Sequence, residues 1–403
     1  MKASIFLVIA SLVSFKVMAD VPQLPQYSSP EIIARTNLND TYSMPEMSFI
    51  VNPQPALNNR GDVVFKVLSA DGQTAAGVWM KRFDDQKGKI YYQAESEMII
   101  SDPSLNQAGV TTFAVSDMAG TEGVFTFDLN TDALTKVIKP NKNIQFYTYP
   151  KLIGKDIYFR ITDKENNRAF IRYDGKMNTI AEEGSSINSK STSYLFKPSI
   201  NEKGDMVYKR RIGKVGEWAE RNADEILLMK NSSTGRETIS IAQDVDMDVT
   251  SVYKSFTNTV GLSENGDVAF ISDIVTGGRG VFLVKAGKHT LIANDKDSDV
   301  SEIEMFEPKV NSNAQVVFRA KDSRGLRSIF IGDGTRLVKL ISEGDVINTD
   351  RGEAKILQNT LYPGFTGGVD FNDKGQILFS VLLVDKKTNK EWGTGVFLLS
   401  PKK

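Results

Sequence analysis

The sequence predicts an all-β protein: a seven-bladed β-propeller of four-stranded antiparallel blades, closed by an N-terminal strand. Three observations lead to this prediction. A unit of roughly 48 residues recurs seven times, each copy reads as four short strands, and the chain begins with a strand that its last copy lacks. Repeats of roughly 40 to 50 residues with four strands each are typical of propeller blades.

Residues 305–341 show the repeated unit most clearly. A first strand, a, ends at Asn311, and strand b at 315–319 is rich in β-branched residues with alternating character. After further turns, strand c lies at 328–331 and strand d at 337–341. Each unit is therefore expected to form one small antiparallel sheet.

The turn between strands a and b locates the other copies. Its pattern is Pro, any residue, a hydrophobic residue, Asn, two residues and Gly; three copies match it in full and the others match it in part. Asn can fold its side chain onto the backbone two residues on, and Gly supplies the positive φ that closes the turn. The copies start at positions 55, 103, 150, 198, 260, 308 and 369, so the steps are 47 or 48 residues except for two of 62 and 61.

The two ends of the chain predict a closed ring. The last copy stops after strand c, at residues 395–399, whereas residues 31–34 match the strands d of other copies, such as 179–181 and 291–293. An open solenoid has no reason to begin with the fragment that its end lacks. A ring uses that fragment to complete the final blade and remove two exposed sheet edges.

The repeat resembles the tandem N-x-x-G propeller-repeat proteins of bacteria, also called choice-of-anchor tandem repeat proteins. The resemblance rests on the turns described above, on Gly-x-Phe in strand c at 123–125 and 280–282, and on Ile-Ala or Ile-Ser in strand d. It covers about residues 31–400. It implies the propeller fold and an exported location, but no particular activity.

Residues 1–19 read as a secretory signal peptide, with Lys2, an apolar run at 5–15, and small residues before Asp20. We therefore expect a periplasmic or extracellular protein, with an extended arm at 20–30 and the propeller at 31–403. The apolar run is too short to span a bilayer, so no membrane span is expected. There is no cysteine, and a net charge of −1 gives no sign of nucleic-acid binding.

Two copies carry insertions of about a dozen residues, at 211–224 between strands b and c, and at 343–365 between strand d and the next strand a. In an antiparallel meander these connections leave the blade at the same end, which we call the loop face. The opposite end, with the short a-to-b turns, is the turn face. Because elaborated loops on a rigid scaffold tend to carry function, we predict ligand binding on the loop face; the alternative is that insertions accumulate there because they are harmless.

The predicted binding residues are the charged and aromatic side chains of these connections and of the last b-to-c loop: Arg211, Glu217, Trp218, Asp345, Arg351, Tyr362 and Trp392. Exposed aromatic side chains such as Trp218 and Trp392 suit stacking on sugars or anchoring of a protein partner. The alternative is that each tryptophan covers the edge of its own blade. Trp79, in strand c, is expected in the core.

Two d-to-a loops carry alternating carboxylates at matched positions: Asp244, Asp246 and Asp248 in one, and Asp295, Asp297 and Asp299 in the next. Gathered oxygen ligands of this kind would suit Ca²⁺. The second loop lacks the Gly and Glu of an EF-hand, having Val300 and Phe306 at those places. The alternative is a solvated acidic rim.

The single histidine, His289, is placed on the turn face, which argues against a Ser-His-Asp triad or a multi-histidine metal site. The sequence therefore favours a non-enzymatic exported scaffold that recognises a protein or a surface or cell-wall glycan through its loop face. The rival hypothesis is a calcium-dependent lyase or hydrolase acting on cell-surface polysaccharide. A third is a structural role in an envelope assembly.

Overall fold

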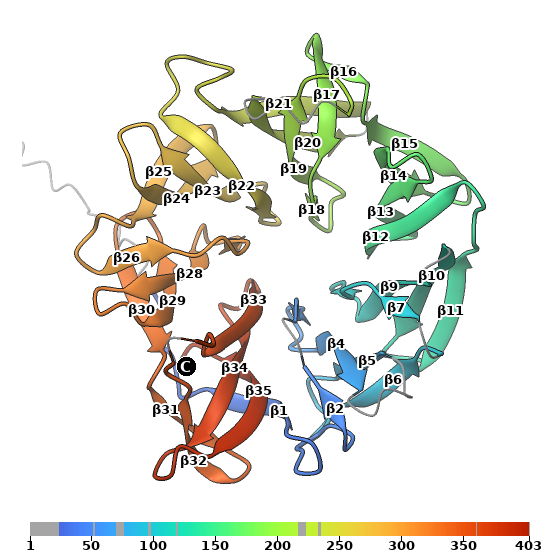
Figure 1. Cartoon of the computed structure of the whole chain (residues 1–403). Coiled ribbons are helices and arrows are strands. Elements are labelled where there is room, and N and C mark those ends of the chain that lie inside the picture. Colours follow the sequence, from blue (N-terminus) through green and yellow to red (C-terminus); the bar gives the residue numbers. More distant parts are fainter. Residues whose placement is uncertain are drawn as a thin grey trace, which may run out of the picture.

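A computed structural model describes residues 24–50, 53–69, 76–95, 98–117, 120–216, 223–232, 235–359 and 361–402. The predicted signal peptide lies outside the described residues. Seven small antiparallel sheets are arranged around a central axis, with the inner strands of the blades facing the centre of the ring (Figure 1). The predicted seven-bladed propeller is thereby confirmed. Within the described ranges no helical segment has the length and apolarity needed to cross a membrane.

The first three blades follow the predicted strand order. Blade one consists of β2 (Ser48–Phe49), β3 (Ala56–Leu57), β4 (Val63–Ser69), β5 (Gly77–Lys81) and β6 (Lys89–Gln93). Blade two consists of β7 (Ile99–Ile100), β8 (Ser104–Leu105), β9 (Val110–Ser116), β10 (Thr121–Asp128) and β11 (Ala133–Ile138). Blade three consists of β12 (Ile144–Ile153), β13 (Asp156–Asp163), β14 (Arg168–Tyr173) and β15 (Met177–Glu182).

The remaining blades keep the same plan, and blades four and seven each add a short hairpin. Blade four consists of β16 (Ser186–Ile187), β17 (Lys190–Leu195), β18 (Ser199–Ile200), β19 (Met206–Ile212), β20 (Asp224–Ser232) and β21 (Gly235–Gln243). Blade five consists of β22 (Tyr253–Leu262), β23 (Val268–Ile274), β24 (Arg279–Lys285) and β25 (Lys288–Asn294). Blade six consists of β26 (Val300–Ile303), β27 (Lys309–Val310), β28 (Val316–Asp322), β29 (Arg327–Gly332) and β30 (Leu337–Ser342). Blade seven consists of β31 (Val346–Thr349), β32 (Gly352–Ile356), β33 (Phe365–Phe371), β34 (Ile377–Asp385), β35 (Glu391–Leu399) and β1 (Glu31–Thr36).

The N-terminal strand completes the last blade, as predicted. β1 pairs antiparallel with β35, from Glu31 opposite Leu398 to Thr36 opposite Thr394. The arm before it continues this pairing, because the backbone N–H of Ser28 donates to the carbonyl of Ser400 at 2.9 Å. The ring is therefore closed by hydrogen bonds between the two ends of the chain.

Proline divides the inner strand of several blades. Pro103, for example, separates β7 from β8, because it has no N–H to give to the ladder. In blade five, Val260 takes the place of proline and β22 runs through. In blade three, Pro150 lies inside β12 at an irregular step in the register, and the preceding Tyr149 has a φ of 55°.

Each blade packs around an aromatic residue in the middle of strand b. In five blades it lies directly opposite an aromatic residue of strand c, and the two rings stack with centroids 4.5 to 5.9 Å apart: Phe65 with Trp79, Phe113 with Phe125, Phe270 with Phe282, Phe318 with Phe330, and Phe379 with Phe397. Cross-strand aromatic pairs of this kind stabilise sheets beyond their burial. The expected core position of Trp79 is confirmed, since its side chain is fully buried.

The residue after this aromatic is a cation in four blades, and it reaches the inner strand of the next blade. Arg160 donates to the carbonyl of Leu195 at 3.0 Å, and Lys209 donates to that of Phe256 at 3.2 Å. Arg319 donates to the carbonyls of residues 365 and 367. Neighbouring blades are thus joined by polar contacts as well as by apolar packing.

The asparagine of the a-to-b turn acts both within its blade and between blades. The side-chain oxygen of Asn58 accepts the backbone N–H groups of residues 60, 61 and 62, which closes the turn as predicted. Its amide nitrogen donates to the side chain of Asp62 and to the carbonyl of Asn106 in the next blade. Asn201 does the same toward Asp205 and Ser263.

Blade five has Ser263 at the asparagine position, and this leaves Asp267 without an amide donor. The Oδ2 atom of Asp267 is buried and has no hydrogen-bond partner among the described residues. Burial raises the pKa of this carboxyl, and the more distant Lys285 offsets the effect only in part. Blade five therefore contains an unsatisfied buried acceptor, whereas the corresponding Asp205 of blade four accepts the amide of Asn201.

We predict that Ser263→Asn stabilises the protein by about 1–2 kcal/mol at neutral pH, because the new amide would satisfy Asp267. A buried carboxyl with a raised pKa destabilises the folded state as pH rises, so the gain should shrink toward about pH 3, which lies below the unfolded pKa of about 3.9 and below the raised folded pKa. Urea unfolding at the two pH values measures it. The reciprocal control, Asn201→Ser, should destabilise by a similar amount; a Ser263→Asn protein no more stable than wild type would contradict this account.

Candidate binding pocket on the propeller axis

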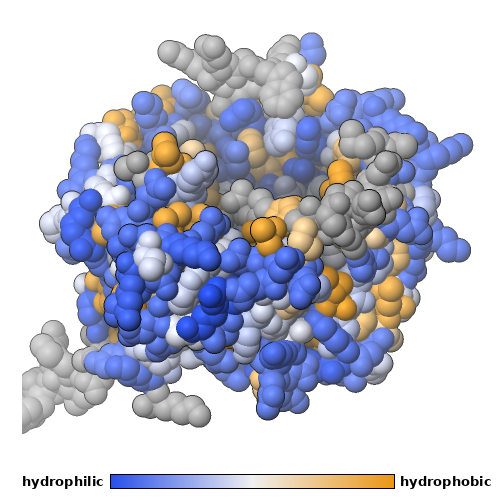
Figure 2. All heavy atoms as spheres, turned by 60° about the horizontal axis from the view of Figure 1, so that its bottom comes forward, coloured by the Kyte–Doolittle hydropathy of each residue, from blue (hydrophilic) through white to orange (hydrophobic). Residues whose placement is uncertain are grey.

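A polar pocket lies on the propeller axis and is lined by the inner strands and the a-to-b turns. The space between its walls is about 1230 Å³, part of it open to solvent. Figure 2 shows a hollow at the centre of the ring, surrounded by a mostly hydrophilic surface. Because the lining includes residues of the a-to-b turns, such as Asn59 and Asp373, the pocket extends to the turn face.

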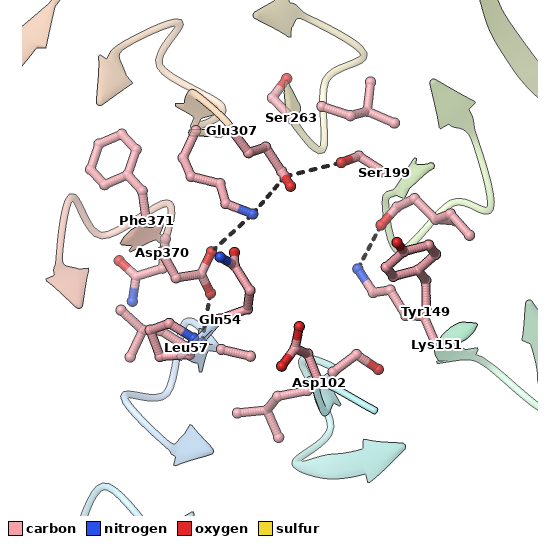
Figure 3. A pocket seen from close by; sticks show the side chains of 18 of the residues that line it. Gln54, Leu57, Asp102, Tyr149, Lys151, Ser199, Ser263, Glu307, Asp370 and Phe371 are labelled. Atoms are coloured by element: carbon pink, nitrogen blue, oxygen red, sulfur yellow. Dashed lines mark hydrogen bonds and ion pairs between the residues drawn. The ribbon is translucent and has the colours of Figure 1, made fainter. Parts of the chain in front are cut away.

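In most repeats the residues before and after the proline position face this pocket, because alternate residues of a strand point to the same side. In chain order the pairs at these positions are Gln54 and Ala56, Asp102 and Ser104, Tyr149 and Lys151, Lys197 and Ser199, Thr259 and Gly261, Glu307 and Lys309, and Gly368 and Asp370. Most of them line the pocket, and several point toward its centre (Figure 3). These residues were not predicted from the sequence, although the signal was present as the two variable positions that flank the proline position.

Glu307 is the centre of an ion-pair network on one side of the pocket (Figure 3). Its carboxylate oxygens lie 2.8 Å from Nζ of Lys197, 2.6 Å from Nζ of Lys309 and 3.1 Å from the Oγ of Ser199, which donates to it. Burial acts to raise the pKa of Glu307, but the two ammonium groups outweigh it and lower the pKa to about 2. The carboxylate is therefore ionised over the physiological range and ties blade four to blade six.

Asp370 extends the network to blades seven and one. Its Oδ1 lies 3.7 Å from Nζ of Lys309, and its Oδ2 accepts the backbone N–H of Leu57 at 2.7 Å. Burial raises the pKa of Asp370, although Lys309 and the N–H of Leu57 oppose the rise. Burial would lower the pKa of Lys309, but Glu307 and Asp370 raise it. Lys309 therefore stays charged between two carboxyl groups.

On the other side of the pocket, formed by blades one to three, the polar side chains make fewer hydrogen bonds and ion pairs within the protein. The side-chain amide of Gln54 and the hydroxyl of Tyr149 make no hydrogen bond to the described part of the chain. Asp102 lies 3.3 Å from Nζ of Lys66, and its side chain is over one-third exposed. Lys151 donates to the carbonyl of Ile200 at 2.6 Å.

The rim of the pocket is a belt of hydrogen bonds between adjacent turns. The backbone N–H of Asn59 donates to Oε1 of Gln107, and that of Asp373 donates to Oδ1 of Asn59, both at 2.8 Å. The N–H of Glu202 donates to the carboxylate of Glu264 in the same way. The polar side chains of the rim therefore hold the blades together.

The residues predicted on the loop face occupy different settings. Glu217 and Trp218 lie outside the described residues. Arg211 pairs with Asp224, with 2.9 Å between Nε and Oδ1. Asp345 accepts the backbone N–H of Ser342 at 2.8 Å, and Tyr362 is exposed, with 63% of its surface accessible. Their binding role stays a prediction.

The prediction that Trp392 is exposed is wrong. This side chain lies at the start of β35, is 7% exposed, and packs under the guanidinium of Arg351, 4.8 Å from the ring centroid. The reason is that the insertion at 343–365 folds as the hairpin of β31 and β32, and β32 pairs with β34 instead of projecting from the blade. The alternative, a tryptophan that covers its own blade, is the arrangement found.

The hairpin of β31 and β32 also contacts the closing strand, β1. Arg35 of β1 is fully buried, and its guanidinium donates to both carboxylate oxygens of Asp350 at 2.9 and 2.7 Å. It also donates to the carbonyl of Asp40 at 2.8 Å and to that of Trp392 at 3.2 Å. Arg351 pairs with the carboxylate of Asp40. The inserted hairpin thus takes part in ring closure.

Several of the carboxylates predicted to bind calcium already accept hydrogen bonds from backbone N–H groups. Asp244 is buried and accepts the backbone N–H of Asp224 at 2.7 Å, whereas Asp246 and Asp248 are exposed. In the other loop, Asp295 accepts the N–H of Arg279 and Asp297 that of Asn294, while Asp299 is exposed. No group of three or more potential metal-ligating side chains occurs among the residues described. Calcium binding stays a prediction, which a calcium titration followed by melting temperature would test.

Comparisons with known proteins bear on the fold and on the family to which the chain belongs. The model of a family described as "Family of unknown function (DUF7453)" matches residues 159–401. No curated protein sequence matches the chain. The resemblance to tandem N-x-x-G repeat proteins stays a prediction.

Several solved structures share the fold. The β-propeller domain of the Trilobed protease from Pyrococcus furiosus has a TM-score of 0.55 at 11% identity, over 88% of this chain and 95% of that one. Oligogalacturonate lyase from Vibrio parahaemolyticus has a TM-score of 0.55 at 10% identity, over 93% and 98%. Puromycin hydrolase has a TM-score of 0.52 at 11% identity over 85% of this chain, which spans only 53% of that enzyme. At these identities the likeness concerns the fold alone.

Proposed function

The chain belongs to the family of unknown function DUF7453, and we propose that it is a non-enzymatic binding protein that takes a small polar ligand in its axial pocket. The main support for this proposal is that some positions of the repeat recur while others vary. The proline, hydrophobic, asparagine and glycine positions are each kept in most copies, whereas the two positions beside the proline hold a different pair of residues in each copy, and six copies contribute at least one of the pair to the pocket lining. A channel with only a structural role would need no such variety.

The arrangement of the charges in the pocket supports this proposal. Lys197, Glu307 and Lys309 come from two blades and are held by ion pairs and a hydrogen bond from Ser199. Side chains fixed in this way lose little freedom when a ligand arrives, and preorganisation of this kind favours affinity. Concave sites with a few convergent polar groups are also the usual form of small-molecule sites.

Export, predicted from residues 1–19, would place this site in the periplasm or outside the cell. A protein or glycan partner on the loop face, through Arg211, Asp345, Arg351 and Tyr362, is the second candidate, and exposed Tyr362 is the observation that favours it. The two candidates use opposite ends of the propeller, so single substitutions can separate them.

We predict that Asp102→Ala weakens ligand binding by roughly ten- to a hundredfold, because it removes a charged acceptor from the pocket. Equilibrium dialysis of the mature protein against a defined mixture of monosaccharides, amino acids and dicarboxylates, followed by mass spectrometry, measures which component is retained. Tyr362→Ala is the matched control on the loop face and should leave retention unchanged. Retention lost with Tyr362→Ala but kept with Asp102→Ala would move the site to the loop face, and no retention at all would refute the pocket proposal.

A further inference from the structure

We infer that the ligand of the axial pocket is a neutral saccharide, seated against blades one to three with one sugar ring on Tyr149. This inference rests on the proposed function and names the chemical class of its ligand. It follows from three features: the balance of charge, the free hydrogen-bonding groups, and the backbone of Tyr149.

The lining of the pocket carries more carboxylates than ammonium groups, and its lysines are already engaged. The lysines are Lys151, Lys197 and Lys309, and the carboxylates are those of Asp102, Glu264, Glu307, Asp370 and Asp373. Lys197 and Lys309 face Glu307, Lys309 also faces Asp370, and Lys151 donates to the carbonyl of Ile200. An anionic ligand would lose hydration without gaining a free counter-charge, so the pocket disfavours anions.

The groups left over for a ligand lie on one side and are suited to hydroxyl groups. The amide of Gln54 can donate and accept, the hydroxyl of Tyr149 can do both, and the carboxylate of Asp102 accepts. Gly368 lies directly beside the amide of Gln54, since a Cβ atom there would come within 2.5 Å of Oε1. The absence of a side chain at Gly368 therefore leaves space for the amide of Gln54, which Figure 3 shows among the side chains that line the pocket.

Tyr149 contributes an aromatic ring to the same side. Its φ of 55° lies in the left-handed region, which is unusual for a bulky residue and is associated with strain at functional positions. The guanidinium of Arg160 lies 5.0 Å from the ring centroid and Nζ of Lys197 lies 5.8 Å from it. An aromatic ring held in this way beside hydroxyl-binding groups matches a pyranose, which has an apolar C–H face and polar edges.

The backbone of Tyr149 also provides a clean test. Glycine adopts a positive φ without strain, so Tyr149→Gly should fold at least as stably as the wild type while lacking the ring. Tyr149→Phe keeps the ring and removes only the hydroxyl. The two variants thereby separate stacking from hydrogen bonding.

The experiment is isothermal titration of the full mature protein with glucose, galactose, N-acetylglucosamine, glucuronate, succinate and glycylglycine, with the melting temperature of each variant measured in parallel. We expect a neutral sugar to bind and glucuronate to bind at least tenfold more weakly than glucose. Tyr149→Gly should weaken sugar binding at least tenfold, Tyr149→Phe only a few fold, and Tyr362→Ala not at all. Binding of succinate or glycylglycine without sugar binding would overturn the saccharide inference and leave the proposed function standing. Absence of binding by every probe would overturn the inference; the dialysis above then decides the proposed function separately.

Discussion

Replacing Arg35 with methionine is expected to lower the free energy of unfolding by about 3–5 kcal/mol. Arg35 is fully buried at the junction of the two chain ends and donates to Asp350 through two nitrogen atoms. Methionine fills much of the volume but leaves the carboxylate of Asp350 and the carbonyls of Asp40 and Trp392 without this donor. Breaking a buried pair by removing one partner costs far more than removing an exposed pair, because a desolvated charge remains.

Urea unfolding followed by tryptophan fluorescence measures this loss. The matched control is Arg351→Met, in the same hairpin, because Arg351 pairs with Asp40 at the surface and both side chains are more than one-third exposed. An exposed pair contributes less than about 1 kcal/mol. Equal losses from the two variants would show that the hairpin acts through packing on Trp392 and not through the buried guanidinium.

The second large effect is expected from Glu307→Gln, which should cost on the order of 3 kcal/mol at pH 7. Glutamine has nearly the same shape but no charge, so Lys197 and Lys309 would share a partly buried site with Asp370 as the remaining carboxylate. The lowered pKa of Glu307, about 2, measures how strongly the surroundings favour its ionised form. The network joins blades four, six and seven, so the substitution should lower the free energy of unfolding of the whole ring.

The pH dependence of this effect has a definite sign. A carboxyl whose pKa is depressed by folding adds stability above its unfolded pKa, near 4.3, and loses that contribution as pH falls toward about 2. The difference between wild type and Glu307→Gln should therefore be largest at pH 6–7 and shrink below about pH 4. Glu302→Gln, which removes an exposed partner of Lys321, is the control and should show a small, flat difference. A difference for Glu307→Gln that does not change with pH would contradict the assigned network.

The fold was predictable because its signals are local and repeated. The Asn and Gly of each a-to-b turn act on backbone groups two to four residues away, so a reader of the sequence can infer their effect without knowing the rest of the chain. The closing strand was predictable for a related reason. Residues 31–34 match other strands d, and one unpaired strand at each end of a ring has a single favourable partner.

The site was less predictable, because the features that define it have no local signal. The residues beside each proline do not repeat, and nothing in the sequence indicates that Glu307 meets Lys197 from a blade two positions away. The insertion at 343–365 was expected to project as a binding loop, yet its chain pairs with β34 and its Asp350 holds Arg35. Length and charge alone do not distinguish a binding loop from a structural hairpin that holds another strand, since both are polar and longer than a turn.

The sequence by itself determined the number of blades, the strand order within each, and the pairing of the two ends, because hydrogen-bonding patterns in turns and strands depend on neighbouring residues. Only the tertiary structure decided which polar side chains converge on the axis, which charges are paired, and which surface remains free. The reason is that these properties depend on distances between residues of different blades, such as the 2.8 Å between Lys197 and Glu307, and such distances are set by the closure of the whole ring.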